Sequence, residues 1–543
     1  MNESSDESGG FHVDQRVHIA GGPRRIGTVR YVGVVEGHEG MWVGVDWDGY
    51  DDGKHDGSVA GVRYFDARTP RSGSLVRPRS LCGGVSVYEA VERRYRGDYT
   101  KEEEDEMYVL STRNNRVSIE FVGKNKVQEK LSQFEDLIGA SLAYLGISSA
   151  GPPLQINATI PNLKELDLTG NLLSKWQDIG AICEQLPDLR VLNVSNNVMR
   201  HDIPELPSLG NIHVLVLNNC SITWKEVEVL KESLPKVEEV HLMANKLSEI
   251  MPAPPSSDAT YVKGFTSLRL LNLEDNCIHS WDEVLKLSQL RSLEQLHLNK
   301  NKLRHIFYPA YHPRPASEDD FNSQDQRIRP FEKLHCLLLG CNEIEDLASV
   351  DSLNSFPSLR DIRLSENPIV DPEKGGIPRF VQVARLAKAQ ILNGSEISPR
   401  ERKESEIRYV RLVINKMQSK EIDHLHPRFM ELKELHGIDH EGPSTGSTGL
   451  QKMSSGLLSV TLKCVGPSMG EKAHLTKKLP PTTSVGKLKV LCESLFKLKS
   501  IRLRLFLQEE GSPMPLLLND DMDTLVDVGI WNGATILVDE EIQ

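Results

Sequence analysis

A nine-residue pattern recurs eight times between residues 163 and 367, and it restricts the fold more than any other feature of the chain. The first copy is LKELDLTGN at residue 163, and the last is LRDIRLSEN at residue 359. Each copy has apolar residues at its first, fourth and sixth positions, which indicates a short strand with one buried face. Since the copies start 23 to 41 residues apart, each repeat is a small unit that buries this face by stacking on its neighbours.

The pattern L-x-x-L-x-L-x-x-N/C is that of the leucine-rich repeat, and it predicts an α/β solenoid over residues 151–395. Two long intervals hold the Pro- and Ser-rich segments 248–261 and 306–330, which we expect to be loops outside the repeats. The last residue of each copy is expected to hydrogen-bond the backbone of neighbouring turns; these residues are Asn171, Asn197, Cys220, Asn245, Asn276, Asn301, Asn342 and Asn367.

Residues between the leucines are expected to form one concave surface of mixed charge. A rigid surface of this kind suits a large protein partner better than a small molecule. The alternative, that about half of these residues are only solvated, stays open. The candidate contact residues are Glu238, His241, Arg269, Asn272, Glu294, His297 and Arg363.

The second informative stretch is DDGKHDGSVAGVRYF, residues 51–65. Gly53 and Lys54 do not belong to a phosphate-binding loop, because His55 stands where such a loop has Ser or Thr. The segments RRIGTVRYVG and MWVGVDWD alternate like strands, and the many glycines indicate tight turns. We therefore expect a small all-β barrel over residues 10–85, with GKHDG as a loop at its rim.

The residues around this loop favour an acidic peptide as its ligand. Residues 10–85 hold ten Lys and Arg against nine Asp and Glu, in a chain with a net charge of −13. Within residues 63–79, five arginines accompany only Asp66, and such a basic strip would attract an acidic peptide. A basic but merely solvated loop is the alternative. Aromatic residues are too numerous for so small a core, so some are expected to line an apolar notch beside Lys54.

These residues resemble a CAP-Gly domain, whose motif G-K-[NH]-D-G is matched by Gly53 to Gly57. The resemblance implies binding of acidic C-termini that end in an aromatic residue, above all the tail of α-tubulin. It assigns Lys54 and His55 to the carboxylates of the tail. Ala67 stands where the family often has Cys, and we expect a core substitution there. The full set of expected tail-binding residues is Gly53, Lys54, His55, Asp56, Gly57, Trp42, Tyr64 and Phe65.

The rest of the chain divides by composition. Residues 1–9 are expected to be a disordered acidic tail, 86–150 a connecting segment with the N-terminal cap, 396–440 a helical C-terminal cap, and 441–456 a flexible linker. Residues 457–543 read as strand, strand, helix, strand and strand, and they resemble the α+β ubiquitin-like β-grasp domain. Because the chain stops at Glu541-Ile542-Gln543 without Gly-Gly, we expect this domain to dock non-covalently.

Several function classes are disfavoured. No run of about 18 apolar residues exists, no secretory signal is present, and the acidic charge argues against nucleic acid. Eight Cys without a CxxC pair indicate reduced thiols rather than a zinc site. His424, His426, His436 and His440 lack a Cys or an acid to complete a metal site. Without a nucleophile elbow, HExxH motif or phosphate loop, we expect no enzyme and no cofactor.

The combination of the three modules, in this order, resembles the tubulin-folding cofactors. The resemblance implies a cytoplasmic, cytoskeleton-associated protein that captures α-tubulin and brings it to β-tubulin bound by cofactor D and other tubulin cofactors, to assemble or dissociate the heterodimer. It also leaves room for proteasome or ubiquitin-pathway receptors at the last domain. Two alternatives remain: a microtubule-associated CAP-Gly protein, disfavoured by the lack of sustained heptads, and a ubiquitin-pathway adaptor.

Overall fold

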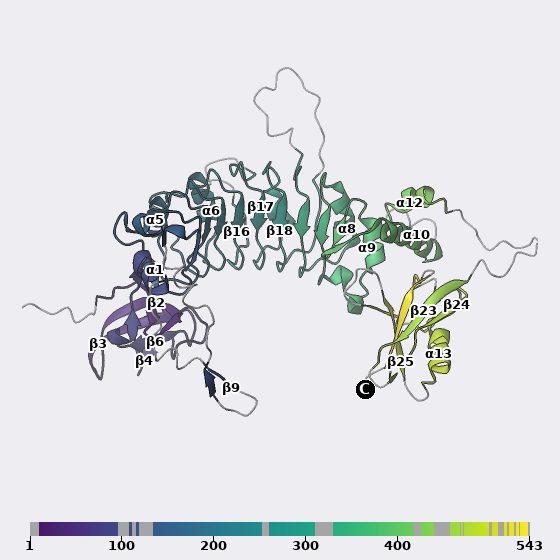
Figure 1. The fold of residues 1–543 in the computed structure, drawn as a ribbon, viewed down its shortest axis with the longest axis horizontal. Helices are drawn as coiled ribbons and strands as arrows, with labels where there is room; N and C mark the ends of the chain where they lie inside the picture. Colours follow the sequence, from purple (N-terminus) through teal and green to yellow (C-terminus); the bar gives the residue numbers. More distant parts are fainter. Residues whose placement is uncertain are drawn as a thin grey trace, which may run out of the picture. The chain divides into compact units, whose positions relative to one another are not determined.

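Figure 1 shows the fold of the chain as a ribbon drawing of the computed structural model. By its internal contacts the chain divides into two compact units. The first unit comprises Met1–Cys277 with Leu290–Leu293, and the second comprises Ile278–Gln289 with Glu294–Gln543. The structure describes residues 10–95, 108–110, 116–118, 134–251, 260–309, 329–416, 425–438, 457–466, 469–470, 472–498, 502–508, 515–518, 521–525, 528–530 and 533–540. The expected tail 1–9, the linker 441–456, most of the two insertions, His424, His440 and the C-terminal residues 541–543 lie outside these residues.

The first part of the chain forms a five-stranded antiparallel sheet in the order β6-β3-β2-β1-β7. Val17, Val43 and the fully buried Trp47 belong to its core. The strands predicted for a small all-β module are therefore present. They are β1 (Arg16–Ile19), β2 (Gly22–Val35), β3 (His38–Trp47), β6 (Gly73–Val76) and β7 (Leu81–Cys82), with a small hairpin of β4 (Ser58–Val59) and β5 (Val62–Arg63).

A parallel strand pair joins this sheet to the start of the repeat region. β8 (Val85–Ser86) pairs with β12 (Ile147–Ser149), and the Val85 amide donates to the Gly146 carbonyl at 2.9 Å. Helix α1 (Val87–Tyr95) follows β8 and buries Val87, Ala90 and Val91. The short hairpin of β9 (Tyr108–Leu110) and β10 (Arg116–Ser118) comes between the two paired strands in the sequence.

Each sequence repeat of the first unit contributes one three-residue strand to a parallel sheet. The register places equivalent residues side by side, for example Leu166 beside Leu192 and Leu215 beside Val240. These strands are β13 (Glu165–Asp167), β14 (Val191–Asn193), β15 (Val214–Val216), β16 (Glu239–His241) and β17 (Leu270–Asn272). A further strand, β11 (Gly139–Ser141), lies before the first copy and pairs with β13. The helices between them are α4 (Gln155–Thr159), α5 (Trp176–Glu184) and α6 (Trp224–Leu230).

The positions that the repeat pattern predicts to be inside are buried. The three apolar residues of every copy, such as Leu163, Leu166 and Leu168, are at most 2% exposed. Asn276 shows the predicted role of the final residue: its Oδ1 accepts from the amides of Asn245 and Leu247, both at 3.0 Å, and its Nδ2 donates to the Leu242 carbonyl at 3.0 Å. This part of the prediction is confirmed.

A left-handed residue precedes that final position in every copy. The φ angles lie between 53° and 64°, and glycine occupies the place only once, at Gly170. Asn or Asp, which tolerate this conformation, stand there in three copies, whereas Ala244, Lys300, Cys341 and Glu366 adopt it against their preference. The turn is therefore imposed by the stacked strands and the buried hydrogen bonds of the next residue.

The second unit continues with strands of the same kind and ends in a helical cap. Its strands are β18 (Gln295–His297), β19 (Cys336–Leu338), β20 (Asp361–Arg363), β21 (Ile391–Leu392) and β22 (Ser395–Glu396). Its helices are α7 (Trp281–Leu285), α8 (Leu347–Ser352), α9 (Arg379–Arg385), α10 (Pro399–Lys416) and α12 (Phe429–Leu435). Phe380, Val410 and Leu432 share one core between the last three helices.

The C-terminal part is a separate α+β fold with its own core. Its sheet order is β24-β23-β27-β25-β26, with β23 and β27 parallel, which is the ubiquitin-like arrangement that the sequence predicts. The elements are β23 (Leu458–Cys464), β24 (Leu475–Leu479), α13 (Val485–Phe496), β25 (Leu503–Gln508), β26 (Leu516–Leu518) and β27 (Thr535–Glu540). Among the described residues, no helix is both long and apolar enough to cross a membrane.

Candidate functional site

The GKHDG loop is held by backbone hydrogen bonds to the residues that lead into β6. The Gly53 amide donates to the Arg71 carbonyl at 2.7 Å, and the Lys54 amide donates to the Gly73 carbonyl at 2.7 Å. Gly73 in turn donates to the His55 carbonyl at 2.9 Å. Gly57 has a φ of 101°, and a Cβ there would lie 1.9 Å from the Phe65 carbonyl oxygen. The loop is thus a rigid backbone frame that presents the side chains of Lys54 and His55.

His55 has a defined proton arrangement. The Gly57 amide donates to its Nδ1 at 3.0 Å, so the neutral ring carries its proton on Nε2. Burial lowers the pKa of His55 below its ordinary value, and the positive charge of Lys54 lowers it further, while Asp56 opposes the shift. At neutral pH this side chain therefore offers one N–H donor and no charge.

Aromatic rings and two glycines shape the sheet next to the loop. The Phe65 ring contacts the edge of His55 with 6.0 Å between centroids, and a Cβ on Gly44 would lie 2.6 Å from the Phe65 ring. Tyr31 pairs with Gly44 across β2 and β3, and its ring contacts Tyr64 at 5.3 Å. Sequence reasoning missed Tyr31, although its place two residues before Gly33 on an alternating strand puts both on one face of the sheet.

Trp42 lies on the same face but is covered by another residue. It pairs with Gly33, and the Arg77 guanidinium lies 3.9 Å from its ring centroid. Arg77 also donates to the Glu39 carbonyl at 2.6 Å. Trp42, Tyr64 and Phe65 thus lie near one sheet face, with Arg77 stacked on Trp42, whereas the sequence predicted only that some aromatic residues line a notch beside Lys54.

The basic strip is largely neutralised by acids from other segments. Arg68 bonds the buried Asp46 at 3.0 Å, Arg71 bonds Asp51 at 2.9 Å, and Arg63 bonds both Asp56 and Asp66. Most of these aspartates come from β3 and the loop that follows it, outside residues 63–79. The positive charge of the strip is therefore smaller than its own sequence predicts.

Lys54 differs from the strip. Its exposed ammonium has no hydrogen-bond or ion-pair partner in the part of the chain that the structure describes. The guanidinium of Arg79, which follows β6 in the sequence, is likewise exposed and without such a partner there. An unpaired ammonium at the tip of a rigid loop is available for an external carboxylate.

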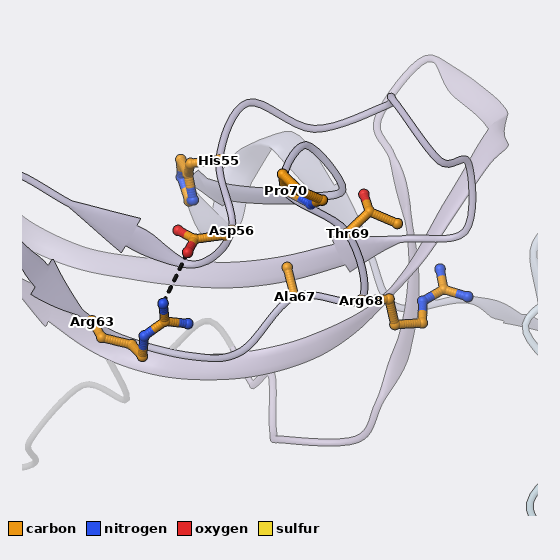
Figure 2. Close-up of a pocket in the computed structure, with 7 residues that line it drawn as sticks. All are labelled: His55, Asp56, Arg63, Ala67, Arg68, Thr69 and Pro70. Carbon is orange, nitrogen blue, oxygen red and sulfur yellow. Dashed lines mark hydrogen bonds and ion pairs between the residues drawn. The ribbon is translucent and has the colours of Figure 1, made fainter.

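A pocket of about 510 Å³ opens beside the loop (Figure 2). Ala67 lines it and is partly exposed, so the expectation that the Ala67 substitution is a core change is wrong. The Ala67 amide donates to the Asp56 carbonyl at 3.0 Å, which holds this residue at the wall of the pocket. The lining residues are His55, Asp56, Arg63, Ala67, Arg68, Thr69 and Pro70.

The proposed contact residues of the repeat region fall into two groups. His241, Asn272, His297 and Arg363 are the last residues of their strands, whereas Glu238, Arg269 and Glu294 each precede a strand by one residue. Asn272 is only 7% exposed and accepts a hydrogen bond from the Glu274 amide at 3.0 Å. Arg269 and Arg363 are exposed, and Glu238, His241, Glu294 and His297 are partly exposed, so exposure does not single out one of them as a contact.

The histidines of the C-terminal cap belong to hydrogen-bond networks. His426 Nδ1 lies 2.7 Å from the Tyr409 hydroxyl, and His436 Nε2 lies 2.9 Å from Glu406. Burial, with the charge of Arg385, lowers the pKa of His426 to about 4. No group of three or more His, Cys, Asp or Glu suited to a metal occurs within the described residues.

Residues 13–81, which contain the loop and the aromatic face, match the CAP-Gly domain family. Over its full length the chain is 59% identical to the tubulin-folding cofactor E of Arabidopsis thaliana, with 99% of each chain covered. It is 31% identical to the tubulin-specific chaperone E of Danio rerio, over 94% of this chain and 96% of that protein. The chain belongs to this family of tubulin-folding cofactors, and the family prediction is confirmed.

Among solved structures, the chain is similar to the solution structure of the C-terminal ubiquitin-like domain of mouse tubulin-specific chaperone E, with 31% identity, 18% of this chain and 97% of that chain covered, and a TM-score of 0.15.

Proposed function

We propose that this chain is a tubulin-folding cofactor that binds the acidic C-terminal tail of α-tubulin along a groove formed by the GKHDG loop and the sheet face that contains Tyr31 and Phe65. The observation that carries the proposal is Lys54, an ammonium without a partner on a loop whose neighbouring arginines are paired. Lys54 attracts the glutamates of the tail, and His55 donates its Nε2 proton to a carboxylate. The terminal aromatic residue packs on the face that contains Tyr31 and Phe65.

We further propose that the repeats form a leucine-rich-repeat solenoid that binds the folded body of the same α-tubulin. The two sites then cooperate, because the second contact forms at an effective concentration of about millimolar. The cofactor promotes assembly, and also dissociation, of the tubulin heterodimer together with cofactor D bound to β-tubulin. It acts in the cytoplasm by binding alone, and its ubiquitin-like domain docks on a further protein such as a proteasome receptor.

A titration of the full-length protein tests both contacts. The ligands are intact tubulin, tubulin whose tails have been removed by proteolysis, and a peptide with the sequence of the α-tubulin tail. Intact tubulin is expected to bind at least about a hundredfold more tightly than the peptide, and tail-less tubulin with intermediate affinity. Equal affinity for the peptide and for intact tubulin would leave the repeats without tubulin as their partner.

A further inference from the structure

A basic hollow of about 380 Å³ lies in the second unit, where the repeats meet the helical cap. It opens between the residues that lead into β20 and those that lead into β21, and Arg402 of α10 completes its wall. Nine described residues line it; three of them, Arg360, Lys388 and Arg402, are basic, and none of the nine is acidic. The wall is therefore positively charged, in a chain whose net charge is −13.

The three basic residues differ in how far the fold itself uses them. Arg402 Nη1 donates to two carbonyls at the end of α9, at 3.2 Å and 3.1 Å, so it caps that helix. Lys388 donates to the Phe356 carbonyl at 2.9 Å. The Arg360 guanidinium is exposed and has no hydrogen-bond or ion-pair partner within the described residues. Folding alone therefore does not account for the charge of Arg360.

The charge of Arg402 is only partly balanced. Glu406, one turn further along α10, lies 3.9 Å away, but it also lies 3.8 Å from Arg428 and 2.9 Å from His436 Nε2. Burial lowers the pKa of Arg402, Glu406 opposes this shift, and Arg428 adds to it. A cation that is poorly hydrated and has a second cation nearby is stabilised by an anion in the hollow that it lines.

A second hollow, of about 620 Å³, adjoins the first and shares Ser358, Arg360 and Gln390 with it. Ile391, which is 37% exposed, gives this second hollow an apolar wall. Acidic and basic side chains occur together there; they are Glu294, Asp361, Lys333, His335 and the shared Arg360. The pair of hollows therefore suits one anionic group with an uncharged continuation, and not a polyanion.

The charge of the first hollow fits a phosphate monoester better than a carboxylate. A phosphate monoester carries a charge of about −1.5 to −2 near pH 7 and has three acceptor oxygens, and guanidinium groups bind such oxygens in pairs. A carboxylate has a single charge and two oxygens, so it would leave more of the surrounding positive charge uncompensated. The amide of Gln390 adds a neutral donor to the same wall.

We propose that the first hollow binds the phosphate group of a phosphorylated serine or threonine in a partner protein, and that the residues next to this group lie in the second hollow. Arg360 is the main contact, because its donors are not used by the fold. This site is separate from the GKHDG loop, and it requires no contact with tubulin. It would make binding of the partner depend on phosphorylation.

Calorimetric titration of the full-length protein with a short peptide tests the proposal. The peptide carries one phosphoserine flanked by alanine and leucine. The comparison ligands are the unphosphorylated peptide, the same peptide with glutamate in place of phosphoserine, and inorganic phosphate. All proteins carry Lys54→Met, so that the GKHDG loop does not contribute, and this protein is the parent for the variants below.

The parent is expected to discriminate between these ligands. It should bind the phosphopeptide at least about tenfold more tightly than the glutamate peptide, because of the additional charge and acceptor oxygen. It should bind the phosphopeptide at least about threefold more tightly than inorganic phosphate, because the second hollow adds apolar contact. The unphosphorylated peptide should show no measurable binding.

Two substitutions in the hollow and one control locate the site. Arg360→Glu should weaken binding of the phosphopeptide at least about tenfold, because repulsion replaces attraction, and Lys388→Met should weaken it about threefold to fivefold. Arg190→Glu is the matched control: Arg190 has the same position in its copy as Arg360, is exposed without a partner among the described residues, and does not line the hollow. Its variant should stay within about twofold of the parent.

Thermal unfolding checks that each variant is folded, and if Lys388→Met is not, Arg360→Glu and its control decide. Parental affinity of the folded Arg360→Glu variant would overturn the site, as would a loss in Arg190→Glu equal to that in Arg360→Glu. Equal affinity for the glutamate peptide and the phosphopeptide would overturn the phosphate chemistry. Equal affinity for inorganic phosphate and the phosphopeptide would overturn a phosphorylated protein as its source, and no measurable binding of the phosphopeptide would overturn the whole proposal.

Discussion

Reversing the charge of Lys54 is the most direct test of the groove. The side chain is exposed and has no hydrogen-bond or ion-pair partner within the described residues, so its replacement breaks no such contact and, inside the protein, alters only its electrostatic effect on His55. Lys54→Met removes the attraction to the tail, and Lys54→Glu replaces it by repulsion. Any loss of affinity is therefore a property of the contact with the ligand.

The expected magnitude follows from the position of the ammonium. Two unit charges about 4 Å apart interact by about 1 kcal/mol in bulk water and about 4 kcal/mol at an effective dielectric constant near 20. Because Lys54 is exposed, the lower value applies. Neutralisation should thus cost about 1 kcal/mol, or about a fivefold loss, and reversal about 2 kcal/mol, or about thirtyfold.

Calorimetry with a peptide that ends in Glu-Glu-Tyr measures these losses at low salt. Raising the ionic strength to about 0.5 M should bring the affinities of the wild type, Lys54→Met and Lys54→Glu closer together, because the Debye length falls well below 10 Å. Arg79→Glu is the matched control, since Arg79 is the other exposed cation of this module without a partner in the described chain. Equal losses in Lys54→Glu and Arg79→Glu would refute a specific role of Lys54, and unchanged affinity in Lys54→Glu would refute the groove.

Three further predictions concern the loop and the repeats. The pKa of His55 should lie below its ordinary value and should rise when the tail peptide binds. Because the folded state disfavours the protonated ring, this residue should make the domain less stable as the pH falls below about 6.5. NMR titration with and without peptide measures both shifts. Gly57→Ala should lower the stability of the CAP-Gly domain by about 2–3 kcal/mol in urea unfolding, because of the strained φ and the clash at Phe65. Asn276→Ala should cost about 3–5 kcal/mol, because it leaves two buried amides without an acceptor. Asn157→Ala, at a partly exposed position of α4, is the control and should cost about 0.5 kcal/mol or less. Similar unfolding midpoints for the two variants would contradict the role of the buried asparagines.

The features that were predictable from the sequence depend on local periodicity. The strand and turn of each repeat follow from the nine residues of one copy. In the first copy, Leu166 belongs to the alternating pattern that predicts the strand, and Asn171 is the buried amide that predicts the turn. The position of GKHDG as a rigid loop was predictable for the same reason, since Gly57 requires a conformation that few residues adopt.

The features that were not predictable depend on distant pairing. Asp46 neutralises Arg68 although 22 positions separate them, so the charge of the strip could not be read along the chain. Ala67 lies at the wall of a pocket because the Asp56 carbonyl holds its amide, and no sequence pattern marks such a bond.

The pairing of β8 with β12 has a consequence for work with fragments. Val85 pairs with Ile147 in a sheet, and its amide donates to the Gly146 carbonyl, although residues 86–146 separate the two strand residues in the chain. Arg24 over the ring of Tyr144, at 5.3 Å, and Arg200, which donates to the Asp14 carbonyl at 3.1 Å, add contacts between the same two regions. A protease cut between residues 96 and 133 should therefore give two polypeptides that migrate together on a sizing column until denaturant is added. A fragment that begins after residue 85, in contrast, would contain β12 without Val85 of its partner strand β8. The unpaired edge of β12 would then be open to pairing with another molecule.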